Sequence, residues 1–188
     1  MIIVSYFILL MTVCFTSVWS YAQSGLYRSD EGSVNFTSDA PLELIKASSH
    51  LMKGVLDPVE NTFAFTVDIK TFEGFNSDLQ RTHFNENYME SQRFPRATFS
   101  GKIIEKLNWD GLGIHELRAK GILDIHGVKQ ERILPGTVEL FADRVFIQAE
   151  FSVPLKNHDI DIPKIVAQKI SEEIKVFIEI VLYKQPSN

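Results

Sequence analysis

Five histidines are the side chains of this sequence best suited to bind a metal ion, namely His50, His83, His115, His126 and His158. Zinc sites combine closely spaced histidines, such as a pair four residues apart on a helix, with cysteine or carboxylate ligands. No two of these histidines have that spacing, and the one cysteine, Cys14, lies in an uncharged segment near the start of the chain. We therefore expect no metal site and no cofactor, and we interpret the histidines as surface or hydrogen-bonded residues. For His126, which follows a predicted strand, we expect a structural hydrogen bond and not a ligand contact.

A hydrolase triad is the second kind of chemistry that the composition permits, because serine, histidine and aspartate are all present. The serine nucleophile of such enzymes often lies in a sharp turn with the pattern Gly-x-Ser-x-Gly. Neither this pattern nor a comparable nucleophile turn occurs in the sequence. We therefore expect a protein that is not an enzyme.

A polar segment, residues 77–88, offers a third candidate for ligand chemistry. Ser77 is followed three residues later by Gln80, which is the pattern of a capping box at the start of a helix. The predicted helix carries Arg81 and His83, and an arginine there could bind the phosphate of a lipid head group. The alternative is a solvated helix face, and the sequence favours this alternative.

The elements that position these side chains follow an uncharged leader. The chain has 188 residues, and none of its 19 Lys and Arg or 24 Asp and Glu residues lies within the first 22. The leader is apolar and closes on Ser20-Tyr21-Ala22, which is typical of a secretory signal peptide cleaved after its last small residue. The alternative is an uncleaved membrane anchor. We expect residues 1–22 to be a signal peptide and residues 23–188 to form one exported domain.

The domain after the leader has the composition of a folded protein. Its net charge of −5 is spread without basic runs, which argues against binding to nucleic acid and against electrostatic docking on an anionic membrane. No second stretch is long and apolar enough to span a bilayer, so we expect no integral membrane segment after cleavage. No cysteine follows Cys14, so the hydrophobic core must stabilise the domain without disulfides.

Alternation of apolar and polar residues is the dominant pattern of this domain, and it predicts strands with one face turned to solvent. The alternation is seen at residues 62–70, 97–103, 117–125, 138–140, 145–153 and 174–182. Residues 33–37 and parts of 42–56 are predicted to be extended as well, and the second of these ranges has no clear register. Asp110-Gly111 between two of these segments predicts a hairpin. Besides the helix at 77–88, a short helix is predicted at 162–170, with Pro163 in its first turn. Its apolar face would carry Ile162, Ile165, Val166 and Ile170.

About eight strands joined mostly by hairpins predict an all-β fold, either a sandwich or a barrel. Several inward positions carry small residues, namely Ala97, Gly101, Ala119, Gly121 and Ala149. Small inward residues favour a barrel with a cavity, because they leave volume unfilled inside a closed sheet. Alternate residues of a strand face the same side of the sheet, and we call this rule strand parity. It selects the following inward side chains as the lining of the cavity: Phe63, Phe65, Val67, Phe99, Ile103, Leu123, Ile125, Leu140, Ile147, Phe151, Ile178 and Ile180.

Three motifs in the middle of the chain resemble landmarks of the YceI-like family. They are Phe72-x-Gly74-Phe75, Phe94-Pro95-Arg96-Ala97-Thr98-Phe99 and Gly121-Ile122-Leu123-Asp124-Ile125-His126-Gly127-Val128. The resemblance implies an eight-stranded antiparallel, lipocalin-like barrel with one or two short helices. It also implies export to the bacterial periplasm or beyond, a polyisoprenoid or similar lipid held in the core, and no agreed enzymatic activity.

The sequence thus favours a periplasmic or secreted binding protein that carries or stores a long apolar lipid, either a polyisoprenoid or a fatty-acid-like chain. A second copy of the chain is a further expected partner, because an imperfectly closed barrel could pair along an edge strand in a homodimer. The alternative is an envelope interaction module whose barrel is filled by its own side chains and binds no lipid. The small inward residues favour the lipid binder over this alternative.

Overall fold

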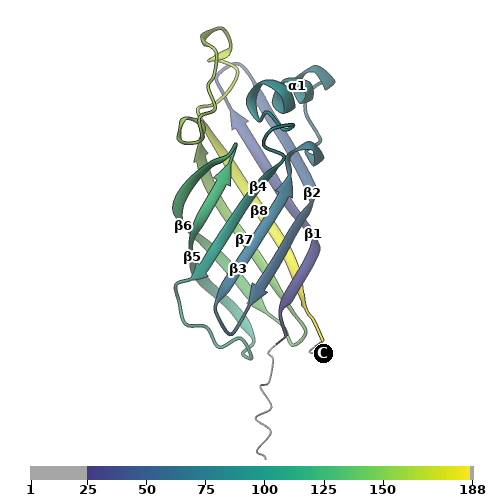
Figure 1. Cartoon of the computed structure of the whole chain (residues 1–188), viewed down its shortest axis with the longest axis vertical. Helices are drawn as coiled ribbons and strands as arrows, with labels where there is room; N and C mark the ends of the chain where they lie inside the picture. Colours follow the sequence, from purple (N-terminus) through teal and green to yellow (C-terminus); the bar gives the residue numbers. More distant parts are fainter. Residues whose placement is uncertain (1–24, 187–188) are drawn as a thin grey trace, which may run out of the picture.

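The computed structural model describes residues 25–186, which form a closed barrel of antiparallel strands (Figure 1). The eight strands are β1 (Tyr27–Asp39), β2 (Leu44–Asp57), β3 (Thr62–Asp68), β4 (Arg96–Ile103), β5 (Gly113–Ile125), β6 (Val128–Leu140), β7 (Arg144–Pro154) and β8 (Glu173–Lys184). Each strand pairs with the next along the chain, and β8 pairs with β1 to close the sheet. The predicted barrel is confirmed. The signal peptide predicted at residues 1–22 lies outside the described residues.

The alternating segments form the barrel wall, as their period predicts. The hairpin predicted around Asp110-Gly111 joins β4 to β5, which pair antiparallel. β6 begins ten residues before the segment at 138–140 that its alternation revealed. Gln130 and Arg132 lie at inward positions of this earlier part, and their polarity conceals the period.

The ladder between β6 and β7 is short, because it contains only four residue pairs, ending at Thr137 and Gln148. Beyond this point Pro135 has no backbone N–H to donate to a ladder. The Nη2 atom of Arg132 instead donates to the carbonyl oxygen of Ser152 at 3.0 Å. A side chain therefore replaces missing ladder bonds in this part of the wall.

The long connections lie at one end of the barrel, the upper end in Figure 1. Between β3 and β4 the chain forms η1 (Ile69–Thr71), α1 (Asp78–His83) and the π-helical turn η2 (Phe84–Tyr88); between β7 and β8 it forms η3 (Leu155–His158) and η4 (Lys164–Val166). The capping prediction for α1 is confirmed, because Ser77 Oγ accepts a hydrogen bond from the N–H of Gln80 at 3.2 Å. α1 and η2 together cover the helix predicted at residues 77–88.

The helix predicted at residues 162–170 is wrong. This segment contains one short 3-10 turn, η4. Val166 and Ile170 line the barrel interior, but Ile165, expected on the same apolar face, is 92% exposed. A single 3-10 turn cannot place these residues on one face, because it does not continue the period on which the prediction rested.

Two histidines hold the upper connections together. His126 (φ 56°) and Gly127 (φ 73°) form the turn between β5 and β6, and two consecutive positive φ angles are typical of a type I′ hairpin. His126 Nδ1 donates to the carbonyl oxygen of His158 at 3.0 Å, which confirms the structural hydrogen bond expected for His126. His158 is fully buried and donates from Nδ1 to the carbonyl of Val128 at 3.1 Å. Burial lowers the pKa of His158, because the charged imidazolium loses hydration.

Packed side chains fill the opposite end of the barrel. Leu56, Val145 and Leu182 have no exposed surface there. The β4–β5 connection closes over them, and its Trp109 packs against this core and donates from Nε1 to Asn61 Oδ1 at 2.8 Å. This end forms the floor of the barrel.

Gly101 and Gly121 face each other across β4 and β5, and the prediction that they leave empty volume is wrong. A Cβ atom at Gly101 would collide with the backbone carbonyl of Lys120, and one at Gly121 would collide with that of Ser100. Glycine is therefore needed because the two strands approach each other closely.

Candidate ligand-binding cavity

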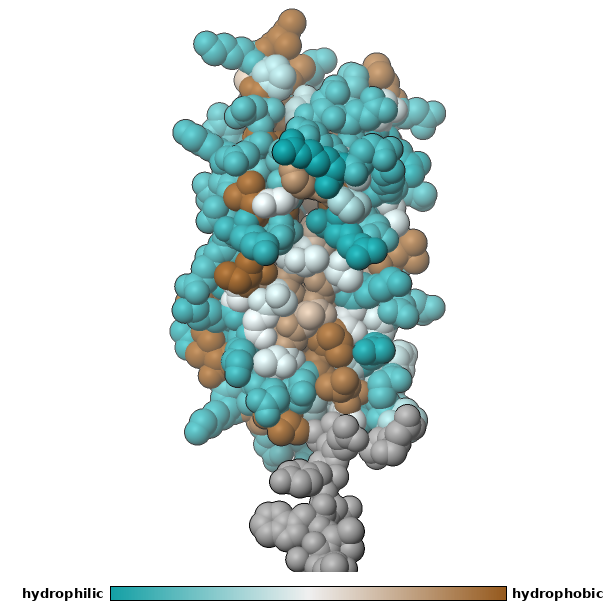
Figure 2. Space-filling view, viewed as in Figure 1, coloured by the Kyte–Doolittle hydropathy of each residue, from teal (hydrophilic) through white to brown (hydrophobic). Residues whose placement is uncertain are grey.

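A cavity of about 520 Å³ occupies the barrel interior, and inward side chains from all eight strands form its largely apolar wall. The outer face in Figure 2 differs, because polar side chains in teal cover most of it and brown side chains are scattered among them. A methylene group occupies roughly the volume of a water molecule, about 30 Å³, so the cavity has room for about seventeen such groups. That volume suits a long hydrocarbon chain.

The structure places ten of the twelve inward residues selected by strand parity on the cavity wall. These are Phe63, Phe65, Val67, Phe99, Ile103, Leu123, Ile125, Ile147, Phe151 and Ile178. The other two, Leu140 and Ile180, belong to the packed core, where each is 2% exposed. That the wall residues contact a lipid remains a prediction.

On β3 and β4, Phe63 contacts two other phenylalanines selected by parity, Phe65 and Phe99. The ring centroid of Phe63 lies 5.6 Å from that of Phe65 and 5.0 Å from that of Phe99. Aromatic rings at these separations attract one another. The contacts orient the three rings as a firm part of the cavity wall.

A second aromatic group, which strand parity did not select, lines the upper part of the cavity. The centroid of Phe36 lies 5.5 Å from Phe72, 5.9 Å from Phe75 and 5.4 Å from Phe84. Phe36 could have been found from the sequence, because it lies two residues after inward Val34 in a segment predicted to be extended. The other three rings come from the connection between β3 and β4, where no period of two applies.

Small residues on the wall leave part of the interior open. Ala97, Ala119 and Ala149 all line the cavity, so the expectation that small inward residues leave room holds for the alanines. Ala119 is paired on both sides, with Ile103 of β4 and with Leu134 of β6. A larger side chain at this position would have to project into the cavity.

Polar side chains on the cavity wall gather at the upper end, between α1 and the β7–β8 connection. Gln80 and His83 line the cavity from α1, Lys169 lines it from the connection, and Glu43 lies beside them. Gln80 Nε2 donates to Glu43 Oε1 at 3.0 Å. We call this opening the mouth. Its side chains can face the polar end of a molecule whose apolar part lies in the barrel.

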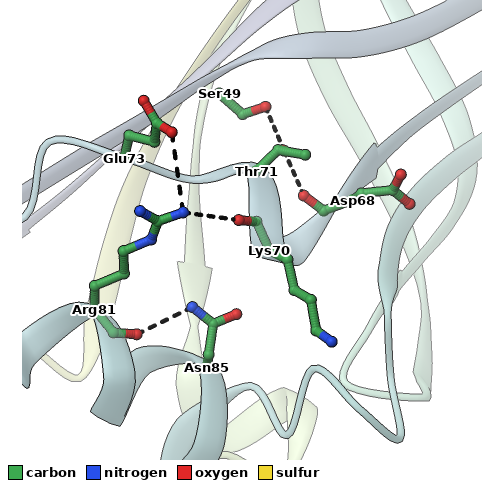
Figure 3. A network of polar contacts seen from close by, with 7 residues as sticks. All are labelled: Ser49, Asp68, Lys70, Thr71, Glu73, Arg81 and Asn85. Atoms are coloured by element: carbon green, nitrogen blue, oxygen red, sulfur yellow. Dashed lines mark hydrogen bonds and ion pairs between the residues drawn. The ribbon is translucent and has the colours of Figure 1, made fainter. Parts of the chain in front are cut away.

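Arg81 secures α1 against η1, as Figure 3 shows. Its Nη2 atom donates to the carbonyl oxygen of Lys70 at 3.3 Å and lies 3.9 Å from Glu73 Oε1. η1 is in turn joined to β2, because the hydroxyls of Thr71 and Ser49 lie 2.6 Å apart. Arg81 is absent from the cavity wall, so its position agrees with the solvated helix face that the sequence favours over a head-group site.

Two further observations concern the described residues. Within residues 25–186, no three His, Cys, Asp or Glu side chains are placed so that they could hold a metal ion. The helices of the same part of the chain are all too short or too polar to cross a membrane. The feature of this region best suited to bind a ligand is therefore the apolar cavity with its polar mouth.

Comparison with known proteins gives a consistent family and fold. The family model for the YceI-like domain matches residues 23–182. No curated protein matches at a significant level.

Several solved structures are similar to the chain. A polyisoprenoid binding domain from Saccharophagus degradans, implicated in plant cell wall breakdown, superposes with a TM-score of 0.72 at 15% identity, over 86% of this chain and 99% of that one. BcnA from Burkholderia cenocepacia gives 0.67 at 13% identity, over 81% and 96%. The YCEI protein of Campylobacter jejuni gives 0.59 at 15% identity, over 74% and 85%. Identities this low indicate a shared fold.

Proposed function

The chain belongs to the YceI-like family, and from that premise we propose that it is an exported, non-enzymatic protein that holds one long apolar lipid chain in its barrel. The observation that carries the proposal is the apolar cavity of about 520 Å³. The polyisoprenoid binding stated for the Saccharophagus degradans domain supports the same class of ligand. A polyisoprenoid or a fatty-acid-like chain would lie along the barrel, with its polar end at the mouth.

Burial of hydrocarbon provides enough free energy for such a complex. Each methylene group removed from water contributes about 0.8 kcal/mol, so a chain of about seventeen groups contributes on the order of 14 kcal/mol. Lost translational freedom and ordering of the chain offset about half of this. The remainder corresponds to a dissociation constant in roughly the micromolar range. No charged residue is needed within the barrel for affinity of this size.

The proposed role is carriage or storage of the lipid in the periplasm or outside the cell. The uncharged leader at residues 1–22 supports export, since it has the composition of a signal peptide. The rival role, an envelope interaction module with a filled barrel, requires side chains to occupy the interior. The volume of the cavity favours the lipid carrier over this rival.

Native mass spectrometry of the purified mature chain tests the proposal. We expect an additional mass that organic extraction removes, and an equivalent complex after geranylgeraniol is added to the extracted protein. A spectrum that shows the bare polypeptide mass both before and after this addition would contradict lipid binding.

A further inference from the structure

Three large apolar side chains project into solvent around the mouth. Ile165 of η4 is 92% exposed, Leu42 of the β1–β2 turn is 66% exposed and Leu79 of α1 is 64% exposed. We call this set the mouth rim. Brown side chains are visible at the upper end of the molecule in Figure 2, where they stand among polar ones.

The mouth rim is continuous with the cavity. Leu79 itself lines the cavity, and so does Val166, which adjoins Ile165 in η4. The backbone N–H of Leu42 donates to the carbonyl oxygen of Gln168 at 2.9 Å, so the β1–β2 turn lies against the segment that follows η4. An apolar path therefore leads from the exposed rim into the barrel.

We propose that the mouth rim docks on the surface of a lipid bilayer and that the lipid chain passes between the bilayer and the cavity through this contact. The inference deepens the proposed function and rests on it, because it gives the source or destination of the lipid. A long hydrocarbon chain that leaves a bilayer for water exposes its whole apolar surface. A rim seated among the acyl chains lets the lipid move without that exposure.

The charges around the rim fit the head-group region of a bilayer. Lys164 adjoins Ile165, and Lys169 lies one turn further along at the mouth. Lysines beside an inserted apolar residue can extend their ammonium groups toward lipid phosphates. Asp78 and Asp161 lie on the same connections, so the local charge is mixed and apolar insertion carries the contact. We therefore expect binding to neutral as well as anionic vesicles, with a weak dependence on salt.

The form of the rim also favours a bilayer over a protein partner. The three side chains come from three separate short segments, the β1–β2 turn, α1 and η4, and each has a charged neighbour in the chain, namely Glu43, Asp78 and Lys164. A stable protein interface needs a large complementary surface with a well-packed core. Single side chains that project from short segments can instead insert separately into a fluid bilayer.

Cosedimentation of the mature chain with phosphatidylcholine vesicles tests this inference. The test variant combines Leu42→Ser, Leu79→Ser and Ile165→Ser. The matched control combines Val59→Ser, Leu112→Ser and Ile114→Ser, because these side chains are 62%, 71% and 67% exposed and lie at the floor end of the barrel. We expect the rim variant to lose at least tenfold in vesicle partitioning and the control to retain the wild-type value. Circular dichroism melts verify that both variants fold.

The outcomes separate the docking inference from the proposed function. Wild-type protein that carries lipid by native mass spectrometry but does not sediment with vesicles would overturn docking and leave lipid binding intact. Equal loss of partitioning in both variants would also overturn docking at the mouth. If sedimentation velocity shows that the rim variant abolishes a dimer, and vesicle binding is unchanged, the rim is a contact between two copies of the chain and the inference is wrong.

Discussion

Replacing Ala119 with phenylalanine should shorten the longest lipid chain that the barrel accepts. Ala119 lines the cavity and is held by ladders on both sides, so the new ring can point only inward. Phenylalanine exceeds alanine by roughly 100 Å³, the space of about three methylene groups, which reduces the capacity of the cavity from about seventeen groups to about fourteen. The change therefore removes about a fifth of the space for a guest.

The loss in affinity follows from the same volume. About three methylene groups left outside the barrel forfeit on the order of 2.4 kcal/mol of transfer free energy. If half of this is expressed in net affinity, as in the estimate for the full chain, the dissociation constant of a long guest rises roughly eightfold. A short guest that still fits should bind about as before.

A series of straight-chain alcohols, from decanol to docosanol, measures this effect by displacement of a fluorescent fatty acid. Affinity for the wild-type protein should rise with chain length and level off near about seventeen carbons, whereas the Ala119→Phe variant should level off near about fourteen. Ala64→Phe is the matched control, because Ala64 lies on β3 and is exposed on the outer face. An identical plateau in the wild-type protein and in a folded Ala119→Phe variant would refute the placement of the lipid in this cavity.

Four further changes have defined outcomes. Phe65→Asp puts a charge on the apolar wall, so it should abolish lipid retention in native mass spectra and lower the melting temperature. Phe99→Trp should narrow the cavity and reduce the lipid load while the melting temperature stays close to that of the wild type; an unchanged load would count against this position. Gly121→Ala forces a Cβ atom onto the carbonyl of Ser100, so urea unfolding should show a loss of about 1–3 kcal/mol. Burial lowers the pKa of His158 from its ordinary value of 6.5. As the pH falls below 6.5, the unfolded chain therefore takes up a proton on this imidazole before the folded protein does, and the folded state loses stability. Above that pH the imidazole is neutral in both states, and its contribution to stability is complete. His158→Asn should make melting temperatures between about pH 8 and pH 5 less dependent on pH, and an unaltered profile would exclude His158 as the source.

Much of the barrel wall could be predicted from local patterns. In residues 62–70 the alternation assigns Phe63, Phe65 and Val67 to one face, and all three line the cavity. The start of α1 could be predicted in the same way, because the hydrogen bond that caps it joins Ser77 to Gln80, three residues later in the chain. Such features depend on contacts between residues close in sequence, which a period or a short motif records.

Other features depended on contacts between distant segments. Parity turns Leu140 and Ile180 inward, but it does not give their height along the barrel, and they lie in the packed core instead of on the cavity wall. That height follows from the tilt of the strands and the stagger between them when the sheet closes. Gly101 and Gly121 appeared to leave space, whereas they allow two backbones to approach closely.

The mouth was also beyond local patterns. Phe84, His83 and Lys169 come from connections without a strand period, and the closed sheet brings these connections to one end of the barrel. The sequence pattern places Ile165 on an apolar helix face, but in the structure its side chain projects into solvent. The sequence therefore determines which side chains face inward along each strand, because that choice depends on neighbours in the chain. The closed sheet determines where the interior stays empty and where it opens, because those properties depend on how all eight strands and their connections pack together.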